Sequence, residues 1–255
     1  MKRSLFTLTL LAATALAGCG RSESVDSFKP DRAEEKVAVA EPKDAARPAA
    51  DAKADGIAET AIAPKDECAS DPAFVAYRTK LAAAVKAKNF EALKPLVDPQ
   101  IKLDFGGGGG LDLLGERLAK GVEGALPTRP HWDELAEIMT LGCALDDAGK
   151  AATMPYAFAR LGGRDGFETM IPRRDGITLY KTADAKGEAV KTLHWEPLTM
   201  TGPANAKDDF VAVKLDDGTT GFVRRADARP ALDYRALFNK DEDGSWKMTA
   251  FIAGD

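Results

Sequence analysis

The chain has 255 residues, of which 45% are hydrophobic and 29% are charged, and its formal net charge is −5 at pH 7. This length allows one large domain or two small ones after a linker is subtracted. The mildly acidic balance excludes the basic surface that nucleic-acid binding requires, and no polybasic segment is present to attract anionic lipids.

The N-terminal segment has the layout of a bacterial export signal. Lys2 and Arg3 precede an uncharged apolar run that ends in Leu16-Ala17-Gly18-Cys19 and is too short for a stable transmembrane helix. This ending resembles the signal of bacterial lipoproteins. The resemblance implies a signal peptide over residues 1–18, palmitate or a similar acyl chain on Cys19, and a periplasmic chain anchored to a membrane. Gly20, where an aspartate would favour the inner membrane, implies the outer membrane. The alternative is an ordinary cysteine beside a cleaved secretory signal.

Residues 19–65 are expected to form a disordered tether. The segment is rich in Ala, Asp, Glu, Lys and Pro, and Phe28 is its one aromatic residue. Such a composition buries too little apolar surface to fold by itself. As a flexible coil the tether would span roughly 35–40 Å, which is comparable to the width of a domain.

Order is expected to begin near Cys68, in a mostly helical domain over residues 66–168. Asp71 and Pro72 provide a capping side chain and a proline at the first helical position. Apolar residues then recur at helical spacing from residue 74 to residue 85. Further helical patterns cover residues 89–97, 111–118 and 132–141, and a short strand is expected at residues 101–105.

Cys68 and Cys143 are the cysteines that remain once Cys19 is assigned to the lipid. In the oxidising periplasm such a pair predicts a disulfide, the alternative being two buried free thiols. The bond would close a loop of about 75 residues and stabilise the fold by about 4.5 kcal/mol through loop-closure entropy.

From Gly176 onward the apolar period changes from helical spacing to alternation, which predicts strands. The expected strands are Ile177–Tyr180, Ala189–Leu193, Pro197–Thr201, Phe210–Leu215, Thr219–Val223, Tyr234–Phe238 and Trp246–Ile252.

Two stretches of this region, Gly176–Asp184 and Val211–Val223, resemble a bacterial SH3-like domain. The second contains the turn Asp216-Asp217-Gly218 followed by Gly221-Phe222-Val223. The likeness covers residues 176 to about 229. It departs at Phe210, where the family usually has a tryptophan, and in a longer loop over residues 201–209. It implies a small β-barrel, and the whole arrangement resembles proteobacterial envelope proteins. The expected fold class is therefore α+β: a mostly helical N-terminal domain plus a small SH3-like β-barrel with a C-terminal β-hairpin over residues 169–255.

The sequence contains no strong motif for a cofactor, a metal or a nucleophile. Residues 106–110 are glycines between a strand and a helix, but no Gly-Lys-Ser/Thr follows, and Asp112 has the wrong charge for a phosphate. His131 and His194 lack the spacing of metal ligands. We therefore expect no cofactor, no metal site and no enzymatic activity.

SH3-like barrels bind ligands in grooves lined by exposed aromatic residues. The resemblance thus implies a candidate ligand site at Tyr180, Trp195, Phe222 and Arg224, with Phe210 and Arg225 nearby; the alternative is that these aromatic residues fill a small core. The function expected is that of a membrane-anchored periplasmic lipoprotein, a non-enzymatic module that binds an envelope protein or peptidoglycan.

Two other functions stay open. The short helices, the strand near residue 101 and the last strand are loosely like the α+β cone of SnoaL-like proteins. That likeness implies a small-molecule-binding or enzymatic pocket with His131, Asp133 or Asp104 as general base. Convergence of these side chains in a closed cavity is the deciding observation. The other possibility is a structural subunit of an envelope assembly.

Overall fold

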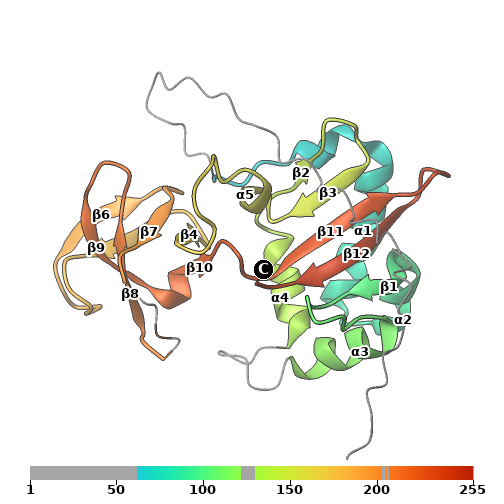
Figure 1. The fold of residues 1–255 in the computed structure, drawn as a ribbon, viewed down its shortest axis with the longest axis horizontal. Helices are drawn as coiled ribbons and strands as arrows, with labels where there is room; N and C mark the ends of the chain where they lie inside the picture. Colours follow the sequence, from blue (N-terminus) through green and yellow to red (C-terminus); the bar gives the residue numbers. More distant parts are fainter. Residues whose placement is uncertain (1–61, 122–129, 203–204, 206, 255) are drawn as a thin grey trace, which may run out of the picture. The chain divides into compact units, whose positions relative to one another are not determined.

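The structure, a computed structural model, describes residues 62–121, 130–202, 205 and 207–254 (Figure 1). The expected signal peptide, Cys19 and most of the expected tether lie outside these residues. All described residues belong to one unit of the chain, residues 49–255. Within the described part, no helix combines the length and apolar character needed to cross a membrane.

Five strands form a mixed sheet in the order β1-β12-β11-β3-β2. β1 (Val97–Lys102) runs parallel to β12 (Trp246–Ile252), whereas β11 (Arg235–Lys240) is antiparallel to β12 and to β3 (Ala151–Met154). β2 (Ala144–Leu145) closes the edge beyond β3. In Figure 1 the red strands β11 and β12 lie between green β1 and yellow β3, so the end of the chain supplies the centre of this sheet.

Short helices accompany the five-stranded sheet. They are η1 (Glu67–Ser70), α1 (Pro72–Lys86), α2 (Phe90–Leu93), η2 (Lys94–Leu96), α3 (Leu111–Lys120), α4 (His131–Ile138) and α5 (Tyr156–Ala159). α1 begins as the sequence predicts, because the carboxylate of Asp71 accepts hydrogen bonds from the backbone N–H groups of Ala73 and Phe74. Proline follows at the first helical position, where its missing N–H has no partner to lose.

The buried face of α1 packs against the last strands of the chain. The ring of Phe74 meets Phe238 and Trp246 edge-on, with centroids 5.5 and 4.9 Å apart. All three side chains are buried in one core that also includes Phe251. Edge-to-face contacts of this kind stabilise beyond the area they bury, so they help to hold α1 against β11 and β12.

A second sheet holds seven antiparallel strands in the order β10-β4-β7-β8-β9-β5-β6. The strands are β4 (Thr169–Pro172), β5 (Ile177–Tyr180), β6 (Ala189–Leu193), β7 (Leu198–Met200), β8 (Phe210–Lys214), β9 (Thr220–Arg224) and β10 (Ala228–Pro230), the last preceded by η3 (Arg225–Asp227). One face covers a core of aliphatic side chains that includes Ile177, Leu179, Val211 and Val223. β10 and β6 are the two edges of this sheet.

The expected fold class, a mostly helical N-terminal domain plus a small SH3-like β-barrel, is therefore wrong. Among the described residues, strands in two large sheets dominate, and the second sheet does not close into a barrel. The C-terminal hairpin expected beside the barrel joins the first sheet instead. Alternation shows that a segment is a half-buried strand, but it does not say which sheet supplies the partner. Ile62, which was assigned to the tether, is buried.

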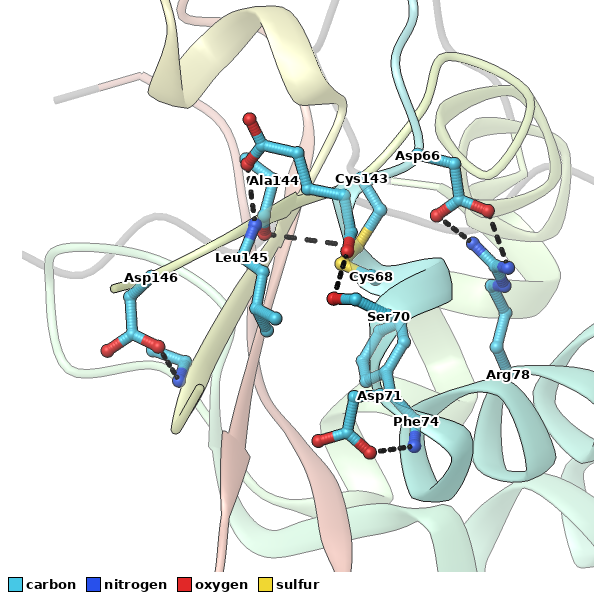
Figure 2. Close-up of a disulfide and its surroundings, with 12 residues drawn as sticks. Asp66, Cys68, Ser70, Asp71, Phe74, Arg78, Cys143, Ala144, Leu145 and Asp146 are labelled. Atoms are coloured by element: carbon cyan, nitrogen blue, oxygen red, sulfur yellow. Dashed lines mark hydrogen bonds and ion pairs between the residues drawn. A yellow bond between two sulfur atoms is a disulfide. The ribbon is translucent and has the colours of Figure 1, made fainter. Parts of the chain in front are cut away.

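The disulfide between Cys68 and Cys143 is present, as predicted, with Cα atoms 5.7 Å apart and both side chains buried (Figure 2). Backbone hydrogen bonds flank it: the N–H of Glu67 donates to the carbonyl of Cys143, and the N–H of Cys143 donates to the carbonyl of Lys65. The bond thus joins the turn before α1 to the residues that lead into β2.

A buried arginine lies where the chain leaves the second sheet for the first. Arg229 on β10 is only 1% exposed, and it donates a 2.7 Å hydrogen bond to the carbonyl of Tyr234. The carboxylates of Glu137 and Asp233 lie 3.4 and 3.5 Å from its guanidinium. A buried charge requires such partners, so this cluster compensates Arg229.

Candidate functional site

The two faces of strands β8 and β9 carry different side chains. Val211, Val213 and Val223 point into the core of the second sheet. Phe210 and Phe222 alternate with them, so they lie on the opposite face, where both are only half-buried. The aromatic residues of these strands are therefore not the core of the sheet.

Strand register gathers the aromatic side chains around a small residue. Tyr180 on β5 is opposite Phe222 on β9, and Phe222 is in turn opposite Ala212 on β8. The rings of Tyr180 and Phe210 have centroids 5.7 Å apart and an interplanar angle of 87°. The rings of Tyr180 and Phe210 are thus in edge-to-face contact, and the small side chain of Ala212 lies on the same face beside Phe222.

A groove of about 540 Å³ lies on the outer face of the sheet beside Phe210, Ala212 and Phe222. This volume lies in the range of small-molecule and peptide sites. The groove is lined by Ala183, Gly202, Lys207, Asp208, Asp209, Phe210, Val211, Ala212 and Phe222.

A second, more polar hollow of about 710 Å³ adjoins the groove. The two share residues 207–210, which form a common wall. The lining of the second hollow also includes basic residues, among them Arg224 and Arg225 at the end of β9. An apolar notch and a polar hollow therefore lie side by side on one face.

The arginines at the second hollow differ in what they bind. Arg225 donates to the backbone carbonyls of Asn205 and Asp208, at 2.6 and 2.9 Å, and so shapes the loop before β8. Arg173 forms an ion pair with Glu137. Arg224 is exposed, and its guanidinium makes no hydrogen bond or ion pair with the described part of the chain. Arg224 is thus available to a ligand.

Tyr180, Phe222 and Arg224, three of the four candidate ligand residues, lie on this face. Trp195, the fourth, lies in the bend between β6 and β7 with a backbone φ of 68°, and it does not line the groove. Ala212 was missed by the sequence analysis, although the same alternation places it on the face of Phe210. The C-terminal residues 234–254 do not plug the groove, since they form β11 and β12 of the other sheet.

The residues of the enzymatic alternative each make other contacts. His131 is 2% exposed and packs against Tyr234 and Phe251, with ring centroids 4.4 and 5.5 Å away. Asp133, whose side chain is 44% exposed, instead pairs with Lys88 at 2.9 Å. Asp104 pairs with Arg117 at 2.6 Å.

The electrostatics of His131 follow from its burial. Burial, and to a lesser extent the positive charge of Arg117, lowers the pKa of His131 from 6.5 to about 4. The imidazole is therefore neutral near pH 7. Its Nδ1 atom is buried without a hydrogen-bond partner among the described residues. The imidazole packs against aromatic rings, and the buried Glu134 lies three residues further along the same helix.

The glycine run after β1 has a structural explanation. The carboxylate of Asp104 accepts hydrogen bonds from the N–H groups of Gly106 and Gly108 at 3.0 and 2.7 Å. A Cβ atom at Gly108 would lie 2.1 Å from that carboxylate, and one at Gly109 would lie 2.4 Å from the carbonyl of Ile101. The loop N–H groups are thus already satisfied by an internal anion, so this is not a phosphate site.

Comparison with protein-family models and with curated proteins finds no match for this chain. Among solved structures the chain is similar to a candidate ketosteroid isomerase from Shewanella frigidimarina NCIMB 400, with 10% identity and a TM-score of 0.27. The likeness covers 72% of this chain and 96% of the other. At this TM-score it supports no conclusion about fold or activity.

Proposed function

We propose that this chain is a membrane-anchored periplasmic lipoprotein that acts as a non-enzymatic binding module for a ligand of the cell envelope. The ligand, an envelope protein or peptidoglycan, occupies the groove on the outer face of the second sheet. The single observation that carries the proposal is the placement of Tyr180, Phe210 and Phe222 outside the core. Aromatic side chains gain about 25 cal/mol for each Å² of apolar surface removed from water, so a ligand that covers them is stabilised.

The anchor is the part of the proposal that rests on sequence. Acylation of Cys19 would hold the mature chain at the outer membrane, since several acyl chains together give firm attachment. The segment between Cys19 and the described fold would let the groove reach its ligand at a distance. The mass of the mature N-terminal peptide, which should begin at an acylated Cys19, checks this part.

Binding is tested with purified sacculi and with solubilised envelope proteins, using the wild-type chain and Phe222→Ser. Because Phe222 forms one side of the groove, we expect the variant to lose at least about tenfold in affinity for whichever ligand the wild type binds. Phe167→Ser is the matched control: Phe167 is an aromatic residue that is 65% exposed and does not line the groove.

The control should bind like the wild type, and both variants should keep its thermal midpoint. Equal binding by Phe222→Ser and the wild type, or no binding by the wild type to either preparation, contradicts the proposed function.

A further inference from the structure

The geometry of the aromatic rings limits what the groove can hold. The planes of Tyr180 and Phe210 are nearly perpendicular, at 87°. Two such rings cannot together form the flat platform on which a sugar ring stacks. The two rings instead contact each other edge-to-face, and the groove beside them is a notch lined by Phe210, Phe222 and the methyl group of Ala212. A notch with a methyl group in its lining fits one small apolar side chain.

The spacing of side chains along β9 sets the distance from this notch to the guanidinium of Arg224. Phe222 and Arg224 are two residues apart on β9, so their side chains leave the same face about 6.5–7 Å apart. An extended peptide has the same spacing between side chains on one of its faces. A peptide lying along β9 can therefore place one side chain in the notch and the next side chain on that face beside Arg224.

The charges around the second hollow indicate what that next side chain is. Arg224 faces the hollow without a partner in the described part of the chain, whereas Arg225 is held by backbone carbonyls. The acidic residues Asp208 and Asp209 also line the hollow, in the loop before β8. A carboxylate is thus favoured on the β9 side, where a charge-assisted hydrogen bond to a guanidinium forms.

We infer that the groove selects an extended peptide in which a small apolar residue and a carboxylate-bearing residue are two positions apart. The apolar side chain lies over Ala212, and the carboxylate binds Arg224. This inference rests on the proposed function, because it takes the groove to be the ligand site.

The test is selection of random hexapeptides on the purified full-length chain. The wild type should enrich Asp or Glu two positions from Ala, Val or Pro. Arg224→Glu should lose this enrichment and gain Lys or Arg at the same position. Lys214→Glu is the matched control, because Lys214 is an exposed base on the same face of β8, at the other end of the strand pair. It should select the wild-type peptides.

Fluorescence polarisation then measures the Kd of a selected peptide and of its Glu→Gln counterpart. We expect at least about a tenfold difference in Kd for the wild type and less than about twofold for Arg224→Glu, as for loss of a hydrogen bond to a charged group. Selection of peptides without the acid, or the same acidic peptides on Arg224→Glu, overturns the inference. Binding to sacculi without any peptide binding also overturns it but leaves the proposed function intact. Failure to bind peptides, sacculi and envelope proteins alike removes both.

Discussion

At the scale of single residues, the buried histidine of α4 makes the stability of the fold depend on pH. The folded-state pKa of His131 is about 4, against 6.5 for the exposed side chain. Below pH 6.5 the unfolded chain therefore binds a proton at this site that the folded chain does not. The stability that neutral His131 contributes is complete above pH 6.5 and is lost as the pH falls toward 4, with a limit of about 3 kcal/mol.

We predict that His131→Phe, which keeps an aromatic ring beside Tyr234, has a smaller loss of unfolding free energy between pH 7 and pH 4 than the wild type. Urea denaturation at several pH values measures it. The matched control is Phe167→Leu, which alters an exposed aromatic residue and no titratable group. It should keep the wild-type pH dependence. Identical slopes for His131→Phe and the wild type would show that His131 does not resist protonation.

The same residue shows what sequence patterns leave open. The helical pattern expected over residues 132–141 places His131 at the start of a helix, and α4 does begin there. The pattern does not show that Tyr234 and Phe251, from the other end of the chain, cover the imidazole. Burial by distant residues is what lowers the pKa, so no local pattern could have predicted it.

At the scale of elements, the start of α1 is held by one carboxylate with two tasks. Asp71 caps the helix and also binds Lys240, at the end of β11, at 2.7 Å. The hydrogen bond from Lys240 is the main reason that the pKa of Asp71 is lowered, and the N–H groups of Phe74 and Ala73 add to it. One side chain thus ties the first helix to the sheet.

We predict that Asp71→Ala lowers the unfolding free energy by about 2 kcal/mol, because it loses both the cap and the charge-assisted bond. Asp71→Asn keeps a capping oxygen and should lose about half as much, as should Lys240→Met, which removes only the partner. Denaturant midpoints compare the three. If Asp71→Asn were as unstable as Asp71→Ala, the cap would contribute nothing.

Alternation of apolar residues in the sequence predicted the bounds of seven strands closely. β5, β6 and β12 have the predicted bounds, and β7, β8, β9 and β11 lie within two residues of them. β4 was missed because all four of its residues are buried, so it shows no alternation. β2 and β10 are short and were missed too, and so was β3, although its burial alternates. Alternation of apolar and polar residues indicates a strand with one solvent-exposed face, but it does not indicate which strand pairs with it.

At the scale of the whole molecule, the disulfide restrains the described fold across 75 residues. It joins the turn before α1 to the residues before β2, and α1, α3 and α4 lie between the two cysteines. A cross-link across so long a loop reduces the entropy of the unfolded chain more than a short one would.

We predict that reduction lowers the unfolding free energy by about 4.5 kcal/mol, the value expected from loop-closure entropy. Chemical denaturation with and without dithiothreitol measures the loss. A double variant, Cys68→Ala with Cys143→Ala, should have a similar midpoint in both buffers, close to that of the reduced wild type. Equal midpoints for the oxidised and reduced wild type would mean that the bond does not stabilise the fold.

The sequence by itself determined the features that depend on neighbouring residues or on chemical type: the cap of α1, the alternating strands and the pairing of Cys68 with Cys143. The lipid anchor at Cys19 remains a prediction of this kind. Only the tertiary structure decided that β11 and β12 join β1 and β3, and that Phe210 and Phe222 face outward around Ala212. The physical reason is the distance along the sequence over which each interaction acts. Caps and alternation arise within a few residues, whereas strand partners and exposed faces depend on which distant surfaces bury each other.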